Sequence, residues 1–242
     1  MEELHQKRNF LDIGEVVNDA FEIYKKTYIQ AGLAILCIYF VLVLLFFIGS
    51  KFFFKMEDLP EIMKNFNPEK FSSAGKLLYI ACSAVFLSLI APFMAGIFKM
   101  FQDSDNNEEI AFSAIFAYIN SPKYIHIVSA TAIIAVLSNG FNLFLKDFFP
   151  EFVGILLGAV ISLAIGILTY IVIPLVIFKN LNCIAAIKES IKQIGAHLFP
   201  AVILMIIAFV FSFIGILAFC IGIFFTIPFL YAMQYSVYKR LN

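Results

Sequence analysis

Hydrophobic residues lie along this chain in long blocks separated by short polar stretches. The blocks cover about residues 29–49, 76–98, 124–145, 152–178, 198–216 and 217–238. Each has about the 20 residues that an α-helix needs to cross a bilayer. The last two are continuous from Leu198 to Val237, too long for one crossing, so we predict a hairpin that turns near Gly215. The pattern predicts an all-α, polytopic membrane protein with six transmembrane helices.

A segment with helical periodicity precedes the first, third and fifth blocks. Apolar residues recur at spacings of three and four in Ile13–Tyr28 and in Ile184–Ile194, with charged residues on the other side. The segment Ile110–Ile119 is more apolar all round. We expect all three to be amphipathic helices lying at the membrane surface. Residues suited to capping their first turns are Asp12 with Glu15, Asp105 with Glu108, and Asn182.

These features predict a single membrane domain, residues 1–242, built from three repeated units. Each unit is an amphipathic surface helix followed by a helical hairpin, and the units cover about residues 11–103, 104–181 and 182–242. The link between the two helices of a hairpin shortens from about 25 residues in the first unit to almost none in the third. The repeat rests on pattern rather than on sequence identity.

Each unit carries a proline near the end of its second helix, followed by a lysine. The three prolines are Pro92, Pro174 and Pro228. A proline removes the hydrogen bond to the carbonyl four residues earlier and kinks the helix, and neighbouring helices can satisfy that carbonyl. We therefore predict helix kinks at all three. The alternative is that proline is simply commoner in membrane helices than in soluble ones.

Small residues recur every four positions along the fourth block, at Gly154, Gly158, Ser162 and Gly166. They share one helix face, and a stripe of small residues lets another helix approach closely. We predict that this stripe is a helix-packing surface.

Composition and charge support the membrane assignment and set an orientation. The chain is 62% hydrophobic and 14% charged, against about 45–50% and about 25% in soluble domains. Eleven of the 17 lysines and arginines fall on the side of the N-terminus, so the positive-inside rule places both termini in the cytoplasm. The external loop, residues 51–75, contains Pro60 at the start of a short predicted helix. The first 28 residues lack the features of a secretory signal, so we expect the first span to remain as an uncleaved anchor.

Residues suited to catalysis or metal binding are scarce. No acidic or basic residue lies well inside a span, which disfavours an ion-coupled pump. His126 and Ser129 are one helical turn apart but lack an orienting third residue. The four cysteines, Cys37, Cys82, Cys183 and Cys220, show no CxxC spacing. We expect no enzymatic activity, no cofactor and no metal.

The run DSDNNEE, Asp103 to Glu109, begins like a calcium-binding loop. Such a loop requires glycine at its sixth position and glutamate at its twelfth, where this chain has Glu108 and Ala114. The alternative interpretation, which we prefer, is that these acidic residues cap the second surface helix and oppose the positive end of its dipole.

The stretches LDIGEVVNDAFEIYKKTY and CIGIFFTIPFLYAMQYSVYKRL resemble a bacterial family of six-span integral membrane proteins. That family includes the membrane domain of glycerophosphoryl diester phosphodiesterases. The resemblance covers nearly the whole chain and implies a multi-pass protein of the bacterial plasma (inner) membrane. We expect no fused catalytic domain, so the resemblance does not imply phosphodiesterase activity.

Two functions are compatible with these observations. The leading hypothesis is a non-enzymatic accessory or scaffold subunit that organises partner proteins or lipids. The alternative is a transporter or lipid-handling protein with a cavity between the repeats, lined by Asn139, Asn142, Thr169 or Gln234. The expected partners are the lipid bilayer and other membrane-protein subunits, with no nucleic acid.

Overall fold

Helices account for all the regular secondary structure in the described part of the chain. The computed structural model describes residues 11–53, 58–217 and 222–242, so Lys7, Arg8, Lys55 and Cys220 lie outside it. The α-helices are α2 (Ile13–Phe53), α3 (Leu59–Asn65), α4 (Ser73–Asp105), α5 (Tyr124–Phe148), α6 (Glu151–Leu168), α7 (Val172–Lys179), α8 (Cys183–Ala196), α9 (Leu198–Ile214) and α10 (Gly222–Leu241). The 3₁₀ helices are η2 (Pro68–Lys70), η3 (Phe112–Phe116) and η4 (Gly215–Leu217).

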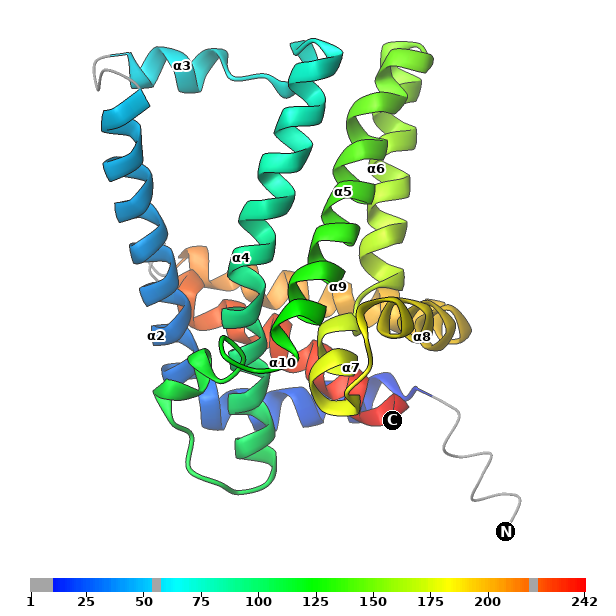
Figure 1. Cartoon of the computed structure of the whole chain (residues 1–242). Helices are drawn as coiled ribbons and strands as arrows, with labels where there is room; N and C mark the ends of the chain where they lie inside the picture. Colours follow the sequence, from blue (N-terminus) through cyan, green and yellow to red (C-terminus); the bar gives the residue numbers. More distant parts are fainter. Residues whose placement is uncertain (1–10, 54–57, 218–221) are drawn as a thin grey trace.

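Four helical segments are long and apolar enough to cross a membrane: α2, α4, α5, and α6 together with α7. A fifth results if α8 and α9, which meet at a 98° bend, are counted as one span. Figure 1 shows α4, α5, α6 and the upper part of α2 standing upright, while the first turns of α2 and the helices α8, α9 and α10 lie across their lower ends. We call this lower end, where α2 begins and α10 ends, the base, and the opposite end the top.

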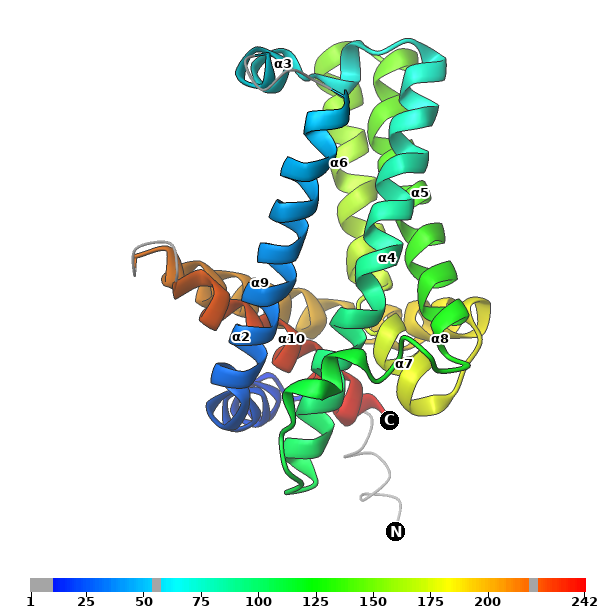
Figure 2. The same cartoon turned by 60° about the vertical axis from the view of Figure 1, so that its left-hand side comes forward.

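The hairpin of α9 and α10 crosses the upright helices in both views (Figures 1 and 2), so the predicted fifth and sixth spans are not confirmed. An aromatic cluster holds it against the first part of α2. Phe21 and Tyr24 of α2 pack with Phe211 of α9 and Phe229 of α10, with ring centroids 5.5–6.2 Å apart. The rings of Phe211 and Phe229 are 4.2 Å apart. Apolar composition predicts two helices here, but their direction follows from these long-range ring contacts.

The two helices of the first predicted hairpin, α2 and α4, each pack mainly against other helices. Helix α2 packs most extensively against α10, while α4 packs against α5 and α5 against α6. At the top, α3 joins α2 to α4, and Pro60 lies in the first turn of α3. The short helix predicted in the loop is therefore confirmed.

The second predicted surface helix is mostly the short 3₁₀ helix η3. Helix α4 continues to Asp105, so this residue ends one helix instead of capping the next. The chain then reverses at Asn107, whose φ of 57° is left-handed. The caps predicted for the other two surface helices are confirmed. The backbone N–H of Glu15 donates to Asp12 Oδ1, and that of Ala185 to Asn182 Oδ1, each at 2.9 Å.

The apolar core lies at the base. Its largest fully buried side chains include Phe98 and Phe101 at the lower end of α4, Leu175 of α7 and Phe229 of α10. The upper parts of α2, α4, α5 and α6 instead expose many large apolar side chains, as expected for helices that face lipid. The base is therefore where distant parts of the chain meet.

Candidate functional site

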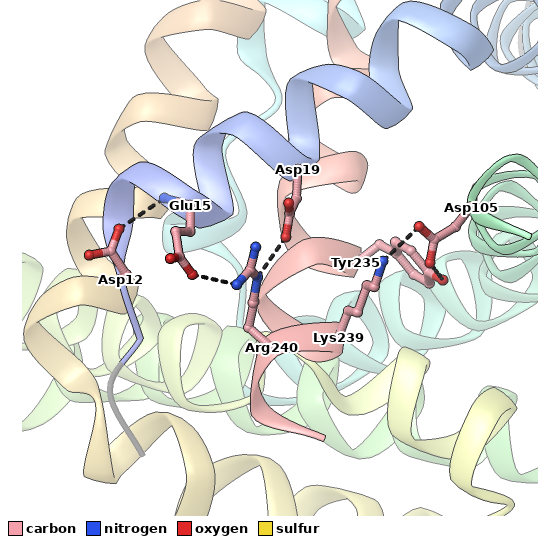
Figure 3. Close-up of polar contacts among 7 residues, drawn as sticks. All are labelled: Asp12, Glu15, Asp19, Asp105, Tyr235, Lys239 and Arg240. Atoms are coloured by element: carbon pink, nitrogen blue, oxygen red, sulfur yellow. Dashed lines mark hydrogen bonds and ion pairs between the residues drawn. The ribbon is translucent and has the colours of Figure 1, made fainter. Parts of the chain in front are cut away.

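Polar side chains from three distant helix ends meet at the base (Figure 3). We call this cluster the polar junction: Glu15 and Asp19 of α2, Asp105 of α4, and Tyr235, Lys239 and Arg240 of α10. The ends of these three helices meet only in the folded protein, so the junction can form only when the base has assembled.

Arg240 connects the end of α10 to the first two turns of α2. Its Nε donates to Asp19 Oδ2 at 2.6 Å and its Nη1 donates to Glu15 Oε2 at 2.5 Å. The hydrogen bond that Arg240 donates to Asp19 is the main reason why the pKa of Arg240 is raised. All three side chains are partly exposed, and exposed pairs contribute at most about 1 kcal/mol each. The fork geometry of the guanidinium thus mainly fixes the position of α2 on α10.

Asp105 connects the end of α4 to α10. Its Oδ1 accepts from Lys239 Nζ at 2.6 Å, and its Oδ2 accepts from the hydroxyl of Tyr235 at 3.4 Å. The neighbouring Asp103 accepts from Lys99 within α4. Asp103 and Asp105, the first two carboxylates of the calcium-loop-like run, are therefore each paired with a lysine. In the described part of the chain, no three His, Cys, Asp or Glu side chains are arranged to hold a metal ion.

A small crevice of about 70 Å³ lies beside the junction. Its lining residues are Asp19, Glu22, Ile23, Lys26, Ser104, Asp105 and Lys239. A space of this size holds only a few water molecules. Its acidic and basic groups largely neutralise one another, so the arrangement is suited to joining helices rather than to activating a substrate.

The junction is not predicted from the sequence. Lys239 and Arg240 count there only as basic residues that set the orientation, and Asp105 is predicted at a helix start. The one local signal is the spacing of four between Glu15 and Asp19, which puts both carboxylates on the same face of α2. Nothing in a single sequence indicates that this face meets the end of α10.

The structure places the small-residue stripe of α6 against α5. A Cβ added at Gly154 would lie 2.7 Å from Lys146 Cα, and one added at Gly158 would lie 3.1 Å from Asn142 Cα. Ser162 Oγ donates to the carbonyl oxygen of Ser138 at 3.0 Å. At Gly166 an added Cβ meets no atom within 4 Å. The stripe thus packs within this chain over its first three positions and not at the fourth.

The three prolines have different surroundings. Helices α4 and α10 continue through Pro92 and Pro228, whereas the fourth span breaks between α6 and α7, just before Pro174. The carbonyl of Tyr170, four residues before Pro174, accepts a hydrogen bond from Gln234 Nε2. A neighbouring helix thus satisfies this freed carbonyl.

The carbonyl of Phe224, four residues before Pro228, faces α2. A Cβ added at Gly32 would lie 3.1 Å from this oxygen. Ser88, four residues before Pro92, is buried, and its Oγ has no hydrogen-bond partner in the described part of the chain. The freed carbonyls of α7 and α10 therefore lie at contacts between helices.

The polar side chains proposed to line a cavity are engaged in helix contacts. Asn139 donates to Ser83 Oγ of α4 at 3.1 Å, and Thr169 donates to the carbonyl of Ile165 at 2.6 Å. Gln234 donates to the Tyr170 carbonyl, and the backbone of Asn142 lies against Gly158. Asn139 and Gln234 thus bond to groups of neighbouring segments, whereas Thr169 bonds within its own helix.

The remaining candidates for chemistry lie apart. His126 and Ser129 occupy the first turns of α5, and no hydrogen bond links them in the described structure. Cys37, Cys82 and Cys183 are free thiols on three different helices.

Comparison with known proteins found no protein family, no curated protein and no solved structure that matches this chain. The resemblance to the six-span bacterial family stays a prediction.

Proposed function

We propose that this chain is an integral protein of the bacterial inner membrane, without enzymatic activity, that serves as an accessory or scaffold subunit and organises partner proteins or lipids. The proposal rests on a contrast within the structure. The base is tightly packed, whereas the upper part of α2 exposes large apolar side chains. The described helices include four or five that are able to cross a membrane, which supports the multi-pass assignment.

The upper part of α2 carries the argument. Residues 44–48 form more than one full turn in which every side chain is large, apolar and exposed. Below them the exposure reaches 61% at Phe40, and burial begins again at Ile35 and Ala34. Above them Ser50 is buried. An apolar turn that is exposed on every side in a membrane contacts lipid or another helix. The base holds α2 in place.

The transporter alternative needs a space lined by polar groups. Asn139, Thr169 and Gln234 are hydrogen-bonded to other protein groups. Their engagement supports the scaffold hypothesis over a solute pathway. A lipid-handling role differs from the scaffold role only in what occupies the surface of α2, and one experiment separates the two.

Photocrosslinking in the native membrane tests the proposal. We expect a photoreactive benzoylphenylalanine in place of Phe46 to yield one discrete protein adduct of constant mass, because a partner helix packs there. The control is the same substitution at Phe152, which is 77% exposed on α6 and should yield no discrete adduct. Lipid adducts alone from position 46 would contradict a protein-scaffold role and favour the lipid-handling alternative.

Cysteine labelling tests the proposed topology, with both termini cytoplasmic, in a variant that lacks the native cysteines. We expect Ser72→Cys, at the top, to react with a membrane-impermeant reagent from outside, and Glu109→Cys, in the loop at the base, to be protected. The reverse pattern would contradict the orientation.

The six-span arrangement in three repeats stays a prediction. The test is whether the tip of the last hairpin can be labelled from outside. In the same labelling experiment, reaction at Ile216→Cys in η4 from outside would support six crossings. Protection there would show that α9 and α10 do not carry the chain across the membrane.

A further inference from the structure

Helix α8 lies beneath the end of α6. Its inner face consists of Ala186, Ser190 and Ile194, all buried. The hydroxyl of Ser190 donates to the carbonyl oxygen of Leu168, the last residue of α6, at 2.8 Å. If the segment formed by α6 and α7 crosses the bilayer, this bond holds α8 beside the base-side half of that crossing, towards the interface between hydrocarbon and headgroups.

A second face of α8 is apolar and exposed. Ile184 and Ile191 are seven residues apart and so lie on one stripe. The stripe continues past the bend into Leu198 and Phe199, and Phe199 is 77% exposed. Exposed apolar side chains on α6 continue down to Leu163, five residues before the Leu168 carbonyl that Ser190 contacts. The stripe therefore lies near a helix surface suited to lipid.

Two lysines border this stripe. Lys188 and Lys192 are exposed, and neither forms an ion pair within the described residues. Glu189 and Gln193, which are hydrogen-bonded to each other at 2.7 Å, lie on the side of the helix away from the isoleucines. The helix therefore has three sectors in order: protein-facing, apolar with a basic border, and polar. A helix with its apolar face in lipid keeps lysines at this border, where they reach up to the headgroups.

We propose that this face of α8, comprising Ile184, Lys188, Ile191, Lys192, Leu198 and Phe199, binds the anionic lipid headgroups of the membrane at the base side. The apolar residues insert below the headgroups, and the two ammonium groups pair with headgroup phosphates. The unpaired positive charge of the lysines is what selects anionic over zwitterionic lipid. This inference goes beyond the proposed scaffold function and does not depend on any partner at α2.

The absence of tryptophan from the chain permits a direct test on the full-length protein. Phe199→Trp introduces a single tryptophan at an exposed position, and its fluorescence can be excited selectively over that of tyrosine. In bilayers of mixed composition, we expect brominated phosphatidylglycerol to quench it more strongly than brominated phosphatidylcholine at equal content. The double substitution Lys188→Gln/Lys192→Gln should reduce the relative association of the anionic lipid by about fivefold for each lysine.

The matched control is Lys64→Gln/Lys70→Gln, which removes the same charge from exposed positions at the top and should leave the preference unchanged. Ile184→Trp provides a second reporter if the first variant folds poorly. Two results would overturn the proposal. A fluorophore that neither brominated lipid quenches would show that the face lies outside the bilayer or is covered by protein. Equal quenching by the two lipids would show contact without selection by charge.

Discussion

An alanine in place of Gly96 is expected to destabilise the protein by about 1–3 kcal/mol, the range for overpacking a filled site. A Cβ at this position would lie 2.4 Å from Ile115 Cα and 2.5 Å from the carbonyl oxygen of Ala114. Both atoms belong to the backbone of η3, so no side-chain rotation relieves the contact. The loop that joins α4 to α5 would have to move away from α4.

The sign of the effect makes this test specific. In a helix without tertiary contacts, the change from glycine to alanine stabilises by about 1 kcal/mol. Gly140, in the middle of α5, has no atom within 4 Å of an added Cβ, so Gly140→Ala is the matched control and should be neutral or stabilising. Thermal unfolding followed by far-ultraviolet circular dichroism in detergent measures both. Equal shifts in the same direction would contradict the close contact between η3 and α4.

The second large effect is expected at the top, where Asp147→Ala should cost roughly 2 kcal/mol of stability. Lys76 of α4 is 4% exposed, and its Nζ lies 2.5 Å from Asp147 Oδ1 at the end of α5. Removing the carboxylate leaves a buried ammonium without its partner. For a fully buried pair this costs about 3–5 kcal/mol, and the exposure of Asp147 to solvent reduces the penalty.

A double substitution separates charge from packing. Lys76→Met/Asp147→Leu removes the ammonium together with the carboxylate, so it should recover most of the stability lost in Asp147→Ala. The same unfolding measurement applies. If the double variant is as unstable as the single one, the loss comes from side-chain packing between α4 and α5 and not from an unpaired charge.

Periodicity and local capping correctly predicted the helices that depend on contacts between residues close together in the sequence. Helix α8 with its Asn182 cap and the short helix after Pro60 are such cases, because each depends on residues within a few positions. The surface helix predicted after Asp105 was wrong because the prediction used only such local signals. Its residues suit a helix start, but η3 must pass Gly96 at backbone contact, and this tertiary constraint outweighs capping preference.

Direction and pairing could not be predicted from one sequence. The block from Leu198 to Val237 is apolar enough to cross a membrane, but the rings of Phe21 and Tyr24 hold the hairpin across the base. Likewise, Arg240 meets Glu15 and Asp19 only because α10 lies along α2. The small residues of α6 predicted close packing, but only the geometry shows that the partner is α5 and that Gly166 is not part of it.

The pairing of α2 with α10 has a consequence for biogenesis. Gly32 and Phe224 are separated by almost the whole chain, so the first helix enters the membrane long before its neighbour is synthesised. At about 5–20 residues per second, the delay is on the order of 10–40 s. During that interval, the face of α2 around Gly32 is open to the insertion machinery and to other nascent helices. Assembly of the base therefore waits for α10, and the ion pairs of Arg240 and Lys239 form only after α10 has been synthesised.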